Sequence, residues 1–85
     1  MSEPKRTLAE AAQKIQQLLK ELEQSNSSAM EREQIAYLTD ETSPGFKRRA
    51  VNALKSCGQA AIEEFLDNPY VNVVIATIES WQEND

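Results

Sequence analysis

The most apolar part of the chain runs from Asn68 to Trp81 (NPYVNVVIATIESW), where only Asn72 and Glu79 clearly require water. Six of its apolar side chains recur at helical spacing and form one broad stripe: Tyr70, Val71, Val74, Ile75, Ile78 and Trp81. Asn68 and Pro69 predict the helix start, since Asn can accept from an early backbone N–H and Pro at the first helical position loses no needed donor. A helix this apolar has to be covered by other helices, so we expect it to be the central one.

A β-strand is the competing interpretation of this stretch. Val, Ile and Thr are frequent in it, and β-branched residues favour strands. However, a strand of fourteen residues would be long, and no second segment shows the alternation needed to pair with it. We therefore predict a helix.

Strong apolar periodicity predicts another helix over residues 7–22. Thr7 and Glu10 form a capping box, in which the Glu side chain reaches back to the Thr amide. The apolar positions follow a heptad seam widened by two residues: Leu8, Ala11, Ala12, Ile15, Leu18, Leu19 and Leu22. A narrow two-stranded coiled coil would not need the widening, so the stripe suits a bundle. Residues 1–6 are expected to form a flexible leader.

A short helix with a thin apolar face is predicted next. Ser28 and Glu31 form a second capping box, and the helix is expected to extend to about Thr39. The polar segment 39–43 (TDETS) is turn-prone and is the best candidate for a hinge between an N-terminal and a C-terminal half.

The C-terminal half begins with Ser43 and Pro44, which repeat the pattern of a cap followed by Pro at the first helical position. Gly58 is expected to end this helix, because glycine tolerates the left-handed conformation. The apolar side of the helix consists of Phe46, Ala50, Ala53, Leu54 and Cys57. Residues 59–67 then predict a short helix that buries Ala61, Ile62, Phe65 and Leu66.

These elements predict an all-α fold, a small bundle of four to five helices with an apolar central C-terminal helix. Residues 7–82 form one helical domain, in which 7–42 make an N-terminal arm or hairpin and 43–82 a three-helix unit. Residues 83–85 form an acidic tail. A chain of 85 residues buries only about 60–65% of its surface on folding, so association, for instance as an intertwined dimer, would add stability.

Charge is unevenly distributed along the chain, whose formal net charge is −5. Residues 44–58 carry four basic side chains and no acid, whereas the segments on both sides are acidic. The basic helix could pair with acidic ones within the fold or between subunits. It could equally be a solvated face, since exposed ion pairs contribute only about 0–1 kcal/mol. The overall negative charge argues against a general nucleic-acid binder.

The sequence lacks the residues that most enzymatic chemistry needs. It has no histidine, which excludes imidazole acid–base catalysis, Cys–His dyads and imidazole metal ligation. Its single cysteine, Cys57, lies on the apolar side of its predicted helix, where a buried thiol is the better interpretation than a reactive one. We therefore predict no catalytic residue, no metal and no cofactor, and a protein that is not an enzyme.

Two sets of residues are candidates for binding a partner. The apolar stripe either packs in the chain's own core or forms a seam between chains, and Trp81 either anchors an interface or closes the core. The resulting candidate interface consists of Leu8, Ile15, Leu18, Leu19, Leu22 and Trp81. The second set is Lys47, Arg48 and Arg49, which could contact phosphate, RNA, an acidic partner or a lipid headgroup, or form a solvated outer face.

A sequence pattern between Pro44 and Gln82 carries a resemblance to a known family. The matching positions are Pro44, Arg49, Val51, Ala53, Leu54, Gly58, Ala61, Glu64, Pro69, Val71, Asn72, Ile78, Glu79 and Trp81. The pattern resembles an uncharacterised family of small all-helical cyanobacterial proteins and modules, some of them joined to pentapeptide-repeat or signalling domains. The chain departs from it at Cys57, Asn68 and Ser80, where the family has Gly, His and Gly. The resemblance implies a cytoplasmic helical interaction module and no particular activity.

The sequence thus predicts a non-enzymatic helical module for protein–protein interaction or oligomerisation. A homodimer is the favoured assembly, and binding to a different protein is the other option. The alternative is a nucleic-acid-associated regulator that uses the basic helix 44–57. The chain has no signal-peptide pattern and no long apolar run, so neither secretion nor membrane insertion is expected. A single cysteine cannot form a disulfide within the chain, which suits the reducing cytoplasm.

Overall fold

The computed structural model describes residues 2–83, and these residues contain five α-helices, one 3₁₀ turn and no strand. The helices are α1 (Glu3–Ser25), α2 (Glu31–Asp40), α3 (Pro44–Cys57), α4 (Gln59–Glu63) and α5 (Val71–Glu83), and the 3₁₀ turn η1 (Asn68–Tyr70) precedes α5. The prediction of a small all-α bundle is confirmed. None of these helices is both long enough and apolar enough to span a bilayer.

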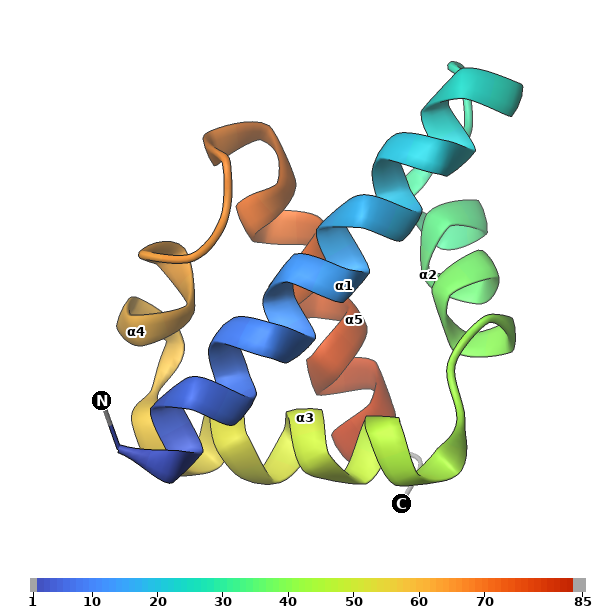
Figure 1. Ribbon diagram of the computed structural model, residues 1–85. Helices are drawn as coiled ribbons and strands as arrows, with labels where there is room; N and C mark the ends of the chain where they lie inside the picture. Colours follow the sequence, from blue (N-terminus) through green and yellow to red (C-terminus); the bar gives the residue numbers. More distant parts are fainter. Residues whose placement is uncertain (1, 84–85) are drawn as a thin grey trace.

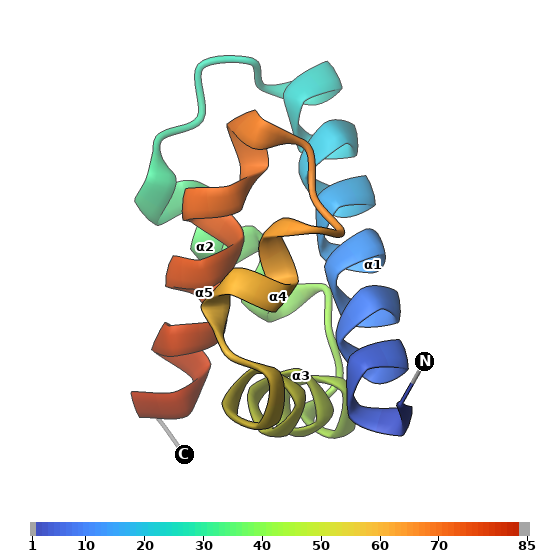
Figure 2. The same cartoon turned by 90° about the vertical axis from the view of Figure 1, so that its left-hand side faces the viewer.

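The helices enclose one core from several sides (Figures 1 and 2). α1 and α5 lie on opposite faces, α3 crosses one end, and α2 and α4 cover the two flanks. The molecule measures 36 × 26 × 16 Å along its principal axes. All five helices contribute buried side chains to a single apolar cluster, so the segments 7–42 and 43–82 share one core.

The predicted central role of the C-terminal helix is confirmed, because α5 contacts each of the other four helices. Val74 and Ile78 are fully buried in it. Trp81 closes the end of the core: its ring packs edge-on against Phe46, with 6.2 Å between centroids, and its Nε1 donates to Thr39 Oγ1 at 2.9 Å. α1 also contacts all four other helices.

The start of α1 was predicted wrongly. The helix begins at Glu3 instead of Thr7, with Ser2 as the N-cap whose Oγ accepts from the Lys5 amide at 3.4 Å. Pro4 lies in the first turn, where its missing N–H costs nothing. Residues 3–6, predicted as part of a flexible leader, are therefore helical. Met1 lies outside the described residues, as do Asn84 and Asp85 of the predicted acidic tail.

The predicted cap of α2 is also wrong. Met30 occupies the N-cap position and makes no side-chain capping bond. Ser28 instead donates from its Oγ to Asn26 Oδ1 at 3.2 Å, within the turn that follows α1. The hydroxyl is thereby used locally, as short polar side chains in turns often are.

Both ends of α3 are confirmed. The Oγ of Ser43 accepts from the Phe46 amide at 3.1 Å, and Pro44 is the first helical residue. Gly58 ends the helix with φ at +86°, a conformation that side chains with a Cβ rarely adopt.

The segment between α4 and α5 differs from the prediction. α4 ends at Glu63 rather than at Asp67, and Asn68 does not cap α5 but begins the 3₁₀ turn, with Asp67 at the preceding position. Residues 64–67 turn instead of continuing the helix because side chains of α1 bind their backbone. Gln13 Nε2 donates to the Phe65 carbonyl and Gln16 Oε1 accepts from the Asp67 amide, each at 2.7 Å.

Candidate functional site

Most of the predicted interface lies inside the molecule. Leu8, Ile15 and Leu19 are 0–1% exposed, and Trp81 is 6% exposed. Leu18 and Leu22 are half-buried. The apolar stripe therefore packs within the chain's own core, and the four buried residues offer no surface to a partner in this structure.

The basic cluster of α3 spreads over the helix instead of forming one patch. Consecutive residues of a helix point about 100° apart, so Lys47, Arg48 and Arg49 diverge. Lys47 folds back and donates from Nζ to the Thr42 carbonyl at 2.9 Å. Arg48 and Arg49 are both exposed, and Arg49 lines two adjoining hollows.

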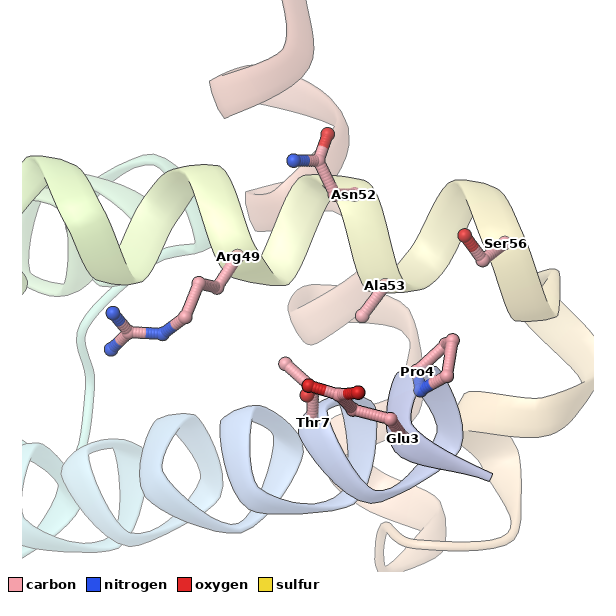
Figure 3. Close-up of a pocket in the computed structure, with 7 residues that line it drawn as sticks. All are labelled: Glu3, Pro4, Thr7, Arg49, Asn52, Ala53 and Ser56. Atoms are coloured by element: carbon pink, nitrogen blue, oxygen red, sulfur yellow. The ribbon is translucent and has the colours of Figure 1, made fainter. Parts of the chain in front are cut away.

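These hollows form a groove between the N-terminal part of α1 and α3, which cross obliquely (Figure 1) and face each other at the groove (Figure 3). Its first hollow has a volume of about 320 Å³. Arg49 and Ala53 extend from α3 toward α1, and Pro4 and Thr7 of α1 face them (Figure 3). The Asn52 side chain points away from α1 (Figure 3). The lining residues are Glu3, Pro4, Thr7, Arg49, Asn52, Ala53 and Ser56.

A second hollow of about 240 Å³ continues the groove past Thr7 and Arg49, which line both parts. Lys14 lies in it, with its Nζ 5.7 Å from the centroid of the Phe46 ring. The guanidinium of Arg49 turns toward Gly45 at the start of α3, where a Cβ would lie 3.7 Å from one of its nitrogens. The second hollow thus has two cationic groups, Arg49 and Lys14, above an aromatic floor, with Glu10 on its α1 side.

Small residues at the contact between α1 and α3 form the apolar base of the groove. Ala11 of α1 and Ala50 and Ala53 of α3 are almost fully buried. Such short side chains let two helices approach closely, and the longer residues beside them then stand as walls. The groove is therefore apolar at its base and polar at its rims.

Most polar side chains of the groove form no hydrogen bond or ion pair within the described residues. Arg49, Asn52, Ser56, Glu3 and Glu10 form no side-chain hydrogen bond and no ion pair with any residue between 2 and 83. α3 supplies no carboxylate that could neutralise Arg49, because it contains no acidic residue. These groups remain available to a ligand.

The opposite flank of α1 is closed by the chain itself. Lys5 pairs with Glu64 at 3.4 Å and Lys20 with Asp67 at 3.5 Å. Together with the Gln13 and Gln16 contacts, these pairs hold residues 64–67 against the helix. Sequence reasoning missed this set. The signal for it was Gln16, a polar residue placed between Ile15 and Leu19 on the apolar stripe and only 6% exposed.

A third hollow, of about 650 Å³, lies beside Tyr70, but its charged groups are already paired. The Tyr70 hydroxyl donates to Glu23 at 3.0 Å, and Lys20 Nζ lies 5.9 Å from the centroid of the same ring. Partial burial raises the pKa of Tyr70 above its ordinary value of about 10, and the Glu23 carboxylate raises it further. The larger hollow is therefore a weaker binding site than the α1–α3 groove.

The structure brings together no catalytic constellation in residues 2–83 that we can identify. Cys57 is half-buried near the end of α3. No group of three or more Cys, Asp or Glu side chains in this part of the chain is arranged to hold a metal ion. What the groove can do chemically is bind, through a guanidinium, an ammonium and neutral polar groups over an apolar floor. No family model, curated protein or solved structure matches the chain.

Proposed function

We propose that the chain is a non-enzymatic protein–protein interaction module whose partner docks on the groove between α1 and α3. The observation that carries the proposal is the difference between the two flanks of α1. On one flank the polar side chains bind the chain's own residues 64–67, whereas on the other they line an open groove without a partner in the described residues.

The proposal gives the predicted oligomerisation a different surface. A homodimer would have to form through this groove or another exposed face, because the apolar stripe that suggested it is buried within the chain. We place the module in the cytoplasm, where reducing conditions suit the lone thiol of Cys57. An interaction role agrees with what the resemblance to the cyanobacterial helical family implies.

The test is capture of a partner with the intact chain immobilised and the protein extract of its cell of origin as the source. Two variants make a matched pair: Arg49→Glu reverses a charge inside the groove, and Arg48→Glu reverses the neighbouring charge outside it. We expect a captured protein to be retained by Arg48→Glu and lost by Arg49→Glu. Capture of nothing, or capture that neither variant changes, would overturn the proposal.

The same variants address the nucleic-acid alternative. α3 exposes Arg48, Arg49 and Lys55 and contains no acid, which is the feature a phosphate backbone would contact. α4, however, has only five residues and is too short to act as a recognition helix. Labelled DNA and RNA titrated at low salt should not bind, and binding that both charge reversals weaken would favour a nucleic-acid-associated regulator instead.

A further inference from the structure

The closed flank of α1 shows which kind of ligand its side chains bind. Two lysines bind the carboxylates of Glu64 and Asp67, at 3.4 and 3.5 Å, and two glutamine amides bind backbone groups of the same segment. The group bound on this flank is therefore a short acidic segment of the same chain, which α1 contacts through both its carboxylates and its backbone.

The open groove repeats this combination without an occupant. Arg49 and Lys14 supply the positive charge, and a guanidinium can bind a carboxylate through two parallel hydrogen bonds. Thr7, which lines both hollows, offers a hydroxyl that can donate to or accept from a peptide backbone. Pro4 and Ala53 provide an apolar surface for a small side chain.

The dimensions of the groove limit the length of such an occupant. Along α1 it extends from Glu3 to Lys14, which at 1.5 Å per residue is about 16 Å. An extended peptide advances about 3.3 Å per residue, so about five residues fill this length. The two hollows adjoin, because Thr7 and Arg49 line both of them, so one extended segment can occupy both.

The carboxylates in the groove restrict the charge of the occupant. Glu3 lines the first hollow and Glu10 the second, so a continuous acidic run would be repelled at both. One carboxylate can offset this repulsion by binding to Arg49 and Lys14, the two cationic groups of the second hollow. The remaining positions then suit neutral or basic residues.

We infer that the groove binds an extended peptide segment of about five residues that contains one acidic residue and one small apolar residue. The acidic side chain binds to Arg49 and Lys14, and the small one lies on Pro4 and Ala53. This inference rests on the proposed function and names the partner's recognition element.

The experiment is selection of random seven-residue peptides displayed on phage against the intact, immobilised chain. We expect enriched sequences that combine a single Asp or Glu with an Ala, Val or Pro. A synthetic peptide of the enriched sequence then serves as the probe, and its affinity is measured by fluorescence anisotropy. Arg49→Glu should weaken binding at least about tenfold, which corresponds to about 1.4 kcal/mol, and Arg48→Glu less than about threefold.

Three outcomes would overturn the inference: no enrichment, enrichment of acidic runs without a small apolar residue, or equal losses with both charge reversals. If selection fails but the cell extract still yields a protein that Arg49→Glu loses, the proposed function stands and only the peptide occupant is wrong. If neither experiment yields a ligand, both are overturned. Since Arg48 and Arg49 are exposed, neither variant is expected to unfold the chain, and circular dichroism checks this.

Discussion

The two flanks of α1 carry similar polar side chains but use them differently. On the flank toward residues 64–67, a buried Gln16, an exposed Gln13 and two lysines hold a turn of the same chain in place. On the flank toward α3, Glu3, Thr7, Glu10 and Lys14 face a groove. Residues 64–67 cover one flank, whereas the other flank borders an open groove.

The difference shows that polarity alone does not distinguish a structural surface from a binding surface. A polar group that is bonded within the fold contributes to stability, and removing it leaves a partner unsatisfied. A polar group that faces solvent contributes little to stability, so its substitution is felt only when a ligand binds. Stability measurements on matched residues of the two flanks can therefore test the assignment.

The largest effect is expected at the apolar seam that both flanks share. Leu19 is 1% exposed in the core, and Leu19→Ala should lower the free energy of unfolding by about 2–5 kcal/mol, through lost burial and the cavity left behind. Urea unfolding followed by Trp81 fluorescence measures this. The half-buried Leu22 is the matched control, and Leu22→Ala should cost less.

Protein concentration separates the two interpretations of this seam. If the seam packs within the chain, the unfolding midpoint is independent of concentration, in the wild type and in Leu19→Ala alike. A midpoint that rises with concentration would mean that the seam joins two chains, and the division into a closed and an open flank would then fail.

The next effect is at Gln16. Replacing it with methionine keeps the shape and removes the acceptor for the Asp67 amide, which leaves that N–H without its bond. We expect a loss of about 1–3 kcal/mol in unfolding free energy. Asn52→Ala on the open flank should change it by less than about 0.5 kcal/mol. Equal losses at the two positions would contradict the comparison.

The features of the fold that the sequence predicts correctly are those that depend on residues close to one another along the chain. The start of α3 at Ser43 and its end at Gly58 follow from capping and backbone preferences of neighbouring residues, and both predictions were confirmed. The apolar stripes of α1 and α5 predicted the core because helical periodicity fixes which residues share a face.

Errors arose where two local signals compete or where tertiary contacts decide. Ser2 and Thr7 are both good N-caps, and the Pro4 in the first turn was the neglected sign that the helix starts earlier. The early end of α4 at Glu63 could not be predicted, because it depends on α1 side chains about fifty positions away in sequence, as the Gln13–Phe65 bond shows.

The groove itself is a tertiary feature. Sequence identified Arg48 and Arg49 as equivalent members of one cluster, whereas the position of α1 places Arg49 in the groove and Arg48 outside it. A partial signal existed, because Arg49 lies one turn from the buried Phe46 and Ala53, and thus at the edge of the apolar side of the helix.

A smaller effect is expected at the lysines of the two flanks. Lys20 pairs with Asp67 and lies over Tyr70, whereas Lys14 lies over Phe46 and has no ion pair in the described residues. Lys20→Gln should cost about 0.2–1 kcal/mol more in unfolding free energy than Lys14→Gln, since exposed ion pairs are worth this much. The difference should shrink in high salt, which screens the pair. A larger loss of unfolding free energy in Lys14→Gln than in Lys20→Gln would show that the open flank contributes more to stability, which contradicts the comparison.

The smallest effect concerns the titration of Tyr70. Partial burial and the hydrogen bond to Glu23 raise the pKa of Tyr70 above about 10, so the folded chain holds this proton more tightly than the unfolded chain. The resulting contribution to stability is complete below pH 10 and is lost as the pH rises through the folded-state pKa. In Tyr37→Phe, Tyr70 is the only tyrosine, and its phenolate absorbance gives the midpoint directly. Glu23→Gln should move the midpoint toward 10, because among the described residues Glu23 hydrogen-bonds the Tyr70 hydroxyl. Glu10→Gln on the open flank should leave the midpoint unchanged. A midpoint at 10 in the folded Tyr37→Phe chain would show that the hydrogen bond to Glu23 is absent in solution.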